Sequence, residues 1–346
     1  MKYTKRIVGS LNGEVIVAHN IKATNGFEVE ILNLGGIITK IITPDKDNNL
    51  ENIVTAYKNI ESYYTNPSYF GAIVGRTSGR ICEGKVVIEG KEYNLNKNYG
   101  LHQGHGGNSG LSSKVWQVDI EEGRDYIKLN LSIKSYHNEE NYPGNLHIVV
   151  SFKVYENYII EETYSAITDK TTLINMTNHT YFNLSGNLKR PVTDQYMKLD
   201  SNKLVEIDDT CVPTGKLLDV TDTPFDFRNI KCIGEHIDDS HEQIKIGCGY
   251  DHPFLLEKKK NIYMEDKISK RNMNITTNQK SVVVYTMNFT DDQTLYNNKK
   301  DQRRYGICFE TQAPPIGRNM CFIEDSLINK DEEYSQKTIY KFGISK

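Results

Sequence analysis

Several features that would tie a chain to a membrane or to nucleic acid are missing from this sequence. No run approaches the ~20 consecutive apolar residues that span a bilayer, and residues 1–17 lack the apolar segment of a secretion signal. The formal net charge is −3, and the lysines and arginines are dispersed. This pattern does not favour nucleic acid or an acidic membrane as a partner. We expect a cytoplasmic protein.

Cysteine is scarce and scattered. The chain has six cysteines in 346 residues, and no two of them form a Cys-x-x-Cys pair. Without an export signal, the sequence predicts free buried thiols rather than a disulfide framework. The six are Cys82, Cys211, Cys232, Cys248, Cys308 and Cys321.

Linkers, low-complexity blocks, repeats and long helical patterns are absent as well. No Pro-rich segment or change of composition divides the chain, so residues 1–346 are predicted to form a single domain. Apolar residues keep no sustained helical period. Only residues 50–64 and 233–244 could form short helical turns.

The dominant pattern is an apolar residue at every second position. Residues 127–133 and 146–154 alternate in this way, residues 27–31 begin a similar run, and residues 282–285 are wholly apolar. Alternation is typical of strands with one buried face. Clusters of Gly, Asn and Asp separate the runs, as turns would. The sequence therefore predicts an all-β protein, a large antiparallel β-sandwich.

Polar side chains interrupt this pattern in residues 175–184. If the segment is one strand, Thr177, His179, Tyr181 and Asn183 share a face. A fully hydrogen-bonding face centred on His179 is typical of a catalytic cleft. The alternative is a solvated outer face on which the histidine has no role.

A second polar interruption lies in residues 305–315. Cys308, Glu310 and Gln312 alternate with apolar residues, and Pro314 ends the strand pattern. A carboxylate is costly to bury unless it is paired or its proton affinity is used. Glu310 is therefore a candidate acid or base near a strand end, where sites open. An exposed strand face is the alternative.

Three further segments combine glycine with charged or imidazole groups. In residues 249–254, Gly and Pro bracket Asp251 and a histidine, which predicts a rigid polar loop or an Asx turn. Residues 75–80 are Gly-rich and basic but lack the spacing of a phosphate loop. His102 and His105 could form a metal pair, but no carboxylate or cysteine joins them locally, and no metal is expected.

Taken together and in order, these segments resemble the aldose 1-epimerase (galactose mutarotase) family. The resemblance covers most of the chain, roughly residues 33–319, and the string Thr-Asn-His-x-Tyr-Phe-Asn-Leu at 177–184 is its most specific element. The other matching stretches are residues 33–36, 44–45, 70–76, 79–81, 105–110, 116, 142–146, 223–227, 249–252 and 310–312. The resemblance implies the galactose mutarotase-like β-sandwich, an isomerase activity and no cofactor.

The resemblance also implies roles for individual residues. Glu310 corresponds to the general base, His179 to the general acid, and His105 to a second histidine near the ring oxygen. The expected sugar-binding residues are Arg80, Asp251, Gly79 and Gln312.

The chain departs from the family pattern at two places near the site. The usual Leu-His-Gly-Gly becomes residues 101–107, so His102 and His105 compete for one role. The interval from Arg80 and the place of Trp116 favour His105. The second departure is that Leu111 stands where the family has an aromatic residue and Gly79 where it has Asn, and Gly79 removes one possible hydrogen bond to the sugar. These departures affect the expected substrate preference more than the reaction.

The implied reaction is the interconversion of the α and β anomers of a free aldohexose such as glucose or galactose. Ring opening removes a proton from the C1 hydroxyl and delivers one to the ring oxygen, so one base and one acid suffice. We expect an ionised Glu310 and His179 to flank the hemiacetal from opposite ends. The partner would be a small free sugar, not nucleic acid or a membrane, and the enzyme a monomer or homodimer.

Three other functions remain open from the sequence. An epimerase of a phosphorylated sugar would need further Arg or Lys residues at the cleft. A glycoside hydrolase could use Asp251 and Glu310 as its two carboxylates, but would leave both histidines without a role. A catalytically inactive sugar-binding protein is disfavoured because every acid–base position is filled.

Overall fold

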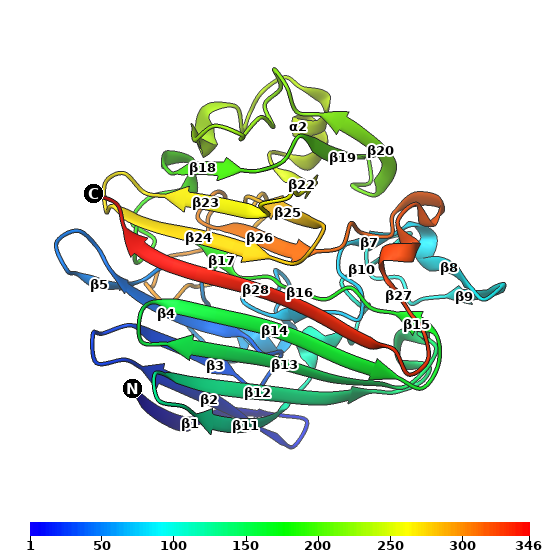
Figure 1. The fold of residues 1–346 in the computed structure, drawn as a ribbon, viewed down its shortest axis with the longest axis horizontal. Helices are drawn as coiled ribbons and strands as arrows, with labels where there is room; N and C mark the ends of the chain where they lie inside the picture. Colours follow the sequence, from blue (N-terminus) through cyan, green and yellow to red (C-terminus); the bar gives the residue numbers. More distant parts are fainter.

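The computed structural model describes residues 1–346, and its largest element is an antiparallel sheet of nine strands. The C-terminal strand β28 pairs with both β14 and β24, so it joins the two halves of the sheet (Figure 1). In order across the sheet, the strands are β11 (Gln117–Glu122), β12 (Tyr126–Ser135), β13 (Leu146–Tyr155), β14 (Ile159–Thr168), β28 (Glu333–Ile344), β24 (Arg271–Thr277), β23 (Asn261–Glu265), β18 (Tyr196–Leu199) and β21 (Lys231–Cys232).

Two smaller antiparallel sheets form the other layer. The five-stranded sheet runs β1 (Lys2–Leu11), β2 (Glu14–Lys22), β3 (Glu28–Leu32), β4 (Ile38–Pro44) and β5 (Leu50–Asn52). The six-stranded sheet runs β17 (Tyr181–Phe182), β26 (Ile307–Gln312), β25 (Ser281–Tyr285), β22 (Asp251–Leu255), β19 (Lys203–Ile207) and β20 (Pro213–Asp219). Figure 1 shows the five-stranded sheet behind β12 to β14 and strand β26 behind β24, with β19 and β20 at the top of the view.

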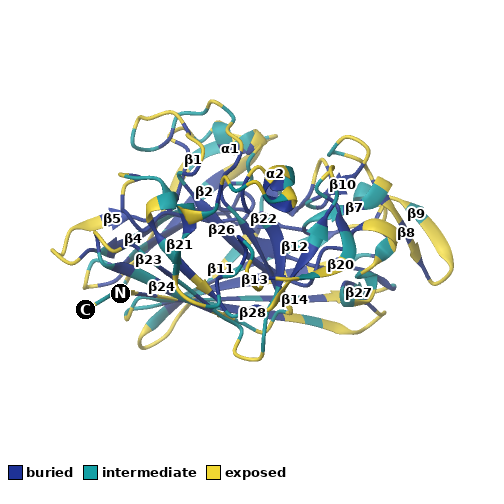
Figure 2. Cartoon of the chain, turned by 90° about the horizontal axis from the view of Figure 1, so that it is seen from above, coloured by how far each residue is buried: buried dark blue, intermediate teal, exposed yellow.

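The core lies between these layers. One cluster of 50 buried residues takes side chains from all three sheets, such as Val29 from β3, Phe152 from β13 and Phe309 from β26. In Figure 2 the strands at the centre of the molecule are mostly buried, and the loops at its periphery are mostly exposed. The predicted β-sandwich is confirmed. So are the strand predictions for residues 127–133 and 146–154, because alternation there follows the two faces of β12 and β13.

Short elements connect the sheets at the edges. Paired two- to four-residue strands are β6 (Ile73–Val74) with β16 (Thr177–Asn178), β7 (Arg80–Ile81) with β10 (Gln103–Gly104), β8 (Lys85–Ile88) with β9 (Lys91–Asn94), and β15 (Thr172–Leu173) with β27 (Leu327–Ile328). The only α-helices are α1 (Ser62–Thr65) and α2 (Glu242–Gly247). Single 3₁₀ turns occupy Cys82–Gly84, Leu111–Ser113, Glu139–Asn141, Val192–Asp194, Ile233–Glu235, Arg318–Met320 and Ile323–Asp325.

Two local predictions were wrong. Residues 251–254 belong to strand β22 rather than to a loop. This strand pairs with β25 along its length but with β19 only through Phe254 and Leu255. Pro253 therefore has no partner on the β19 side, where its missing N–H breaks no backbone hydrogen bond. The segment 175–184 is not one strand. It pairs first with β6 and then, after a break at His179 and Thr180, with β26.

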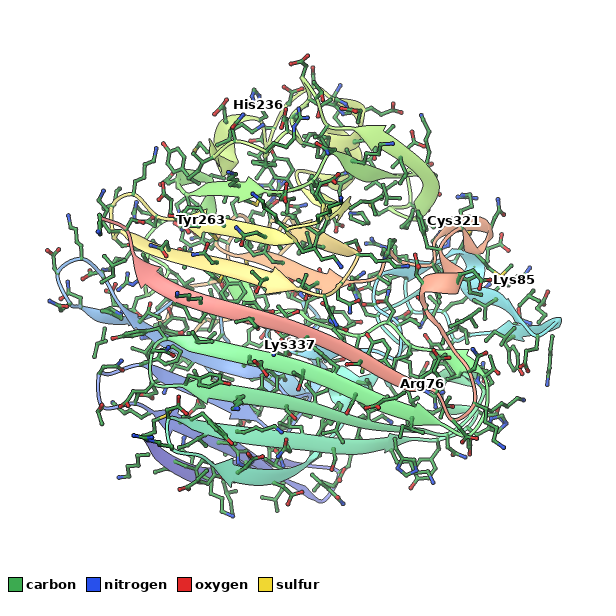
Figure 3. All side chains as sticks on the ribbon, viewed as in Figure 1. Arg76, Lys85, His236, Tyr263, Cys321 and Lys337 are labelled. Carbon is green, nitrogen blue, oxygen red and sulfur yellow. The ribbon has the colours of Figure 1, made fainter.

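The cysteines agree with the predictions only in part. The six thiols form no disulfide, but only Cys308 is buried, so the prediction of buried thiols was wrong for the other five. Cys321, labelled in Figure 3, lies on the surface. Neither helix has the length and apolar character needed to cross a membrane.

Candidate active site

A pocket of about 240 Å³ lies over one face of the six-stranded sheet, and 20 residues line it. The tertiary fold brings six of the seven candidate residues into its wall, although they are far apart in the chain. These six are Gly79, Arg80, His105, His179, Asp251 and Glu310. Gln312 is not among the lining residues.

Backbone contacts with the strand β6 region fix His179. The His179 N–H donates to the Ala72 carbonyl at 2.9 Å, and the Gly71 N–H donates to the His179 carbonyl at 3.1 Å. Gly71 has a φ of +69°, and a Cβ there would lie 2.3 Å from the Ile38 carbonyl oxygen. Only glycine fits this close approach. His179 lies at the break between β16 and β17, and its imidazole lines the pocket.

Strand β26 carries Glu310. The residue pairs with Val283 on β25, and the strand ends two residues later at Gln312. Its side chain is only 4% exposed. The strand is buried on both faces, because apolar Ile307 and Phe309 enter the core while Glu310 enters the pocket.

Glu310 and His179 are in direct contact. The Glu310 Oε1 and His179 Nε2 atoms are 3.3 Å apart, and both side chains are almost fully buried. The two groups therefore lie side by side. From the sequence, we expected them at opposite ends of the hemiacetal. Adjacency suits a hemiacetal, because the C1 hydroxyl and the ring oxygen are bonded to the same carbon.

Burial shifts the pKa values of this pair in opposite directions. Burial raises the pKa of Glu310 well above its usual range, the Asp251 carboxylate adds to the rise, and Arg80 opposes it. Burial lowers the pKa of His179 to about 4. Both directions favour a neutral pair in the empty pocket, with a proton on the carboxyl. This differs from the ionised Glu310 expected from the sequence.

Arg80 and Asp251 form a second pair of titratable groups on the wall. Arg80 Nη1 lies 3.8 Å from Asp251 Oδ2 and donates to the Cys211 carbonyl at 3.1 Å. The guanidinium also lies over the Tyr99 ring, 5.2 Å from its centroid. These contacts leave donors and acceptors facing the pocket at fixed positions, as binding of a polyhydroxylated ligand requires.

The choice between the two histidines is decided by position. His105 lines the pocket, its ring centroid is 5.5 Å from that of His179, and its buried Nδ1 has no protein partner. Burial lowers the pKa of His105 well below its usual value, and His179 and Arg80 add to this effect. His102 instead accepts a hydrogen bond from the Glu83 N–H and does not line the pocket.

Gly79 and Gln312 differ from their expected roles. Gly79 has a φ of +73°, and a Cβ there would lie 2.4 Å from Pro315 Cβ. This backbone therefore has no room for the asparagine of the family pattern. Gln312 is fully buried, and its side-chain amide has no protein partner. Its position outside the pocket wall does not support the prediction that it binds the sugar.

Sequence reasoning missed the aromatic part of the wall. Tyr69, Tyr99 and Tyr285 line the pocket, and Phe289 lies at its rim with 60% of its surface exposed. No signal in the sequence separates these tyrosines from the other members of a set of 22. Apolar ring faces beside polar groups are typical of small-ligand sites.

The remaining candidate motif is structural. Arg76, labelled in Figure 3, is buried and donates to the carbonyls of Tyr136, Pro143 and Gly144 and to the Ser135 hydroxyl. It ties loops together rather than facing the pocket. No group of three or more His, Cys, Asp or Glu side chains is arranged to hold a metal ion.

The fold is a β-sandwich, and its pocket places a buried carboxyl–imidazole pair beside polar side chains, an arrangement typical of an acid–base enzyme for a small polar ligand. The family model described as aldose 1-epimerase matches residues 18–341. The chain belongs to the aldose 1-epimerase family. It is an isomerase that interconverts the anomers of an aldose.

Individual relatives agree over nearly the whole chain. The chain is 31% identical to the galactose mutarotase of Mus musculus and 30% identical to that of Homo sapiens, in each case over 92% of this chain and 91% of the relative. It is 26% identical to the maltose epimerase of Levilactobacillus brevis over 99% of both chains. A crystal structure of galactose 1-epimerase from Lactobacillus acidophilus superposes with a TM-score of 0.90 and 24% identity, covering 100% of this chain and 99% of that one, which supports the fold.

Proposed function

We propose that Glu310 and His179 are the base and acid of aldose anomerisation in this chain, acting on free aldohexoses such as glucose and galactose. The observation that carries the proposal is the 3.3 Å contact between Glu310 Oε1 and His179 Nε2 inside the pocket. A base and an acid this close reach two oxygens on one carbon. Residues 1–346 would act as one domain, because β28 completes the sheet formed by earlier segments.

The pair is suited to a reaction that must run equally well in both directions. During opening, the Glu310 carboxylate takes the C1 hydroxyl proton while the protonated His179 gives its Nε2 proton to the ring oxygen. The C1–O5 bond breaks, an aldehyde forms, and the pair becomes carboxyl and neutral imidazole. After rotation about C1–C2, the reverse transfers close the ring on the other face. The pair thus keeps one proton between its two members throughout.

The active charge arrangement has to form when sugar binds, because burial favours the neutral pair in the empty pocket. A sugar hydroxyl donating to Glu310 favours its carboxylate, and a ring oxygen accepting from His179 favours the imidazolium. Arg80 and Asp251 would hold other hydroxyls, and neutral His105 would donate near the ring oxygen. The enzyme thereby completes its acid–base state only around a ligand.

The charge of the wall disfavours a phosphorylated substrate. Arg80 is the only Lys or Arg among the 20 lining residues, whereas three of them, Glu310, Asp251 and Asp291, carry carboxyl groups. A dianionic phosphate needs an excess of cationic donors. A neutral free sugar meets no such requirement.

Polarimetry tests the proposed function. Freshly dissolved α-glucose and α-galactose should reach their anomeric equilibrium faster in the presence of enzyme. In a separate assay, the enzyme should release no reducing sugar from an oligosaccharide. Sugar binding with no effect on the rate would identify a binding protein instead. Release of reducing sugar would identify a hydrolase.

A further inference from the structure

The His179 imidazole has a second contact, on the side away from Glu310. The Cys308 Sγ atom lies 3.4 Å from His179 Nδ1 and 4.0 Å from the His179 carbonyl oxygen. Cys308 is fully buried on β26, two residues before Glu310, and pairs across the ladder with Tyr181. One strand therefore presents both groups that touch the imidazole nitrogens.

The hydrogen-bond partners of the thiol follow from counting protons. A thiol has one proton, and its sulfur is also a weak acceptor. Both sulfur contacts can be satisfied together if the thiol proton goes to the His179 carbonyl and Nδ1–H donates to the sulfur. The Cys308 thiol remains protonated, because burial raises its pKa well above the usual value, with Glu310 and Asp251 adding to the rise.

From this geometry we propose that Cys308 is a positioning residue that accepts a hydrogen bond from Nδ1–H of His179 and so reserves Nε2 for the proton exchanged with substrate. The inference rests on the proposed function of the Glu310–His179 pair. The sulfur is the only side chain that bonds Nδ1, and the backbone of His179 itself is the one other acceptor beside this nitrogen.

A weak acceptor suits a reversible proton exchange. A carboxylate at Nδ1 would stabilise the imidazolium and hold the proton on His179. A thiol sulfur orients the ring without this charge, so the proton affinities of His179 and Glu310 can remain close enough for transfer in both directions. The other titratable groups around the imidazole are His105, Tyr69, Tyr181 and Tyr285.

Nitrogen NMR on ¹⁵N-histidine-labelled wild-type enzyme tests the assignment without relying on activity. His179, identified by the signal missing from H179N, should show a protonated Nδ1 at neutral pH. An unprotonated Nδ1 in the wild-type spectrum would overturn the proposal. Failure of the enzyme to accelerate anomerisation would instead refute the proposed function. The NMR spectrum would still show whether Nδ1 of His179 carries a proton.

Two substitutions extend the test to catalysis. C308V fills the space but removes the acceptor, and its kcat should fall roughly 10-fold to 100-fold, as expected when a buried polar group loses its partner, with little change in KM. C308S retains an acceptor and should keep kcat within about threefold of wild type and Nδ1 protonated. Folded C308V with wild-type kcat would contradict the proposal.

A matched control separates this effect from loss of a thiol in general. Cys232 is half-buried and donates to the Thr193 carbonyl at 3.1 Å, outside the pocket wall. C232V should leave kcat and the His179 nitrogen signals unchanged. An equal loss of kcat in C232V and C308V would show that the effect comes from general packing and would overturn the assigned role of Cys308.

Discussion

Two buried carboxyl groups in this molecule have nearly the same burial and very different surroundings. Glu162, on β14, is 1% exposed and lies in the core of the nine-stranded sheet, where it accepts a hydrogen bond from the Tyr164 hydroxyl at 2.6 Å and a longer one from Tyr340 at 3.5 Å. Glu310 is 3% exposed and faces His179 and a pocket.

The partners, rather than burial itself, distinguish the two carboxyl groups. Burial raises the pKa of Glu162 to about 7, and the tyrosine hydroxyls beside it oppose the rise. Tyrosines do not exchange protons near neutral pH, so the two tyrosine hydroxyls beside Glu162 can only donate hydrogen bonds to it. The group beside Glu310 is an imidazole, which can give and take a proton, and the pair faces a pocket. A strongly shifted pKa therefore identifies a reactive carboxyl only together with a proton partner and access.

The largest effect should come from removing the proton acceptor in the pocket. Glu310→Gln keeps the shape but cannot accept a proton, so kcat should fall by about 10² to 10⁴. Polarimetric rates measure this, and an unchanged thermal transition serves as the control for folding. Near-normal turnover would remove Glu310 from the reaction. Glu162→Gln should leave kcat unchanged, and an equal loss there would break the comparison.

The second effect concerns stability, to which Glu162 and Glu310 contribute with the same sign because burial raises the pKa of both. Folded Glu162 has a pKa of about 7, above its unfolded value, so the protein keeps the full contribution below the unfolded pKa. The stabilising free energy that Glu162 contributes is lost as the pH rises towards 7, because in this range the carboxyl ionises in the unfolded chain but not in the folded protein. Glu162→Gln should flatten this part of the stability curve, measured by urea denaturation between pH 4.5 and about 7. An unchanged slope would contradict the assignment.

The third effect is a shift of the pH profile. The active pair holds one proton, and losing that proton at high pH stops the reaction. The Asp251 carboxylate raises the pKa of Glu310, so Asp251→Asn should move the alkaline limb of kcat/KM to lower pH, besides raising KM. The position of the limb is the readout. A limb that stays in place would separate Asp251 from the proton pair.

The smallest effect should come from the rim. Phe289 is exposed beside the pocket and its backbone N–H donates to the Tyr285 hydroxyl at 3.3 Å. Its ring face can pack against a sugar without taking part in proton transfer, so Phe289→Ala should raise KM by about tenfold or less and leave kcat unchanged. Comparing KM for a free hexose and a reducing disaccharide shows which ring it contacts. A fall in kcat would place Phe289 closer to the chemistry.

Prediction from the sequence succeeded where a local pattern records which face of a strand is buried. The alternation in β12 and β13 indicated both strands, because each residue contacts the core or solvent according to its parity. It failed at residues 175–184, where the period continues although the strand does not. There the chain changes partner from β6 to β26, a choice made by distant segments.

The sequence by itself determined the β class and the family and predicted the acid–base groups, because alternation and ordered motifs are local properties of the chain. Only the tertiary structure decided that Glu310 and His179 touch, that His105 rather than His102 faces the pocket, and that Gln312 does not. Contacts, burial and pKa values depend on which remote segments pack together. Spacing along the chain does not specify that arrangement.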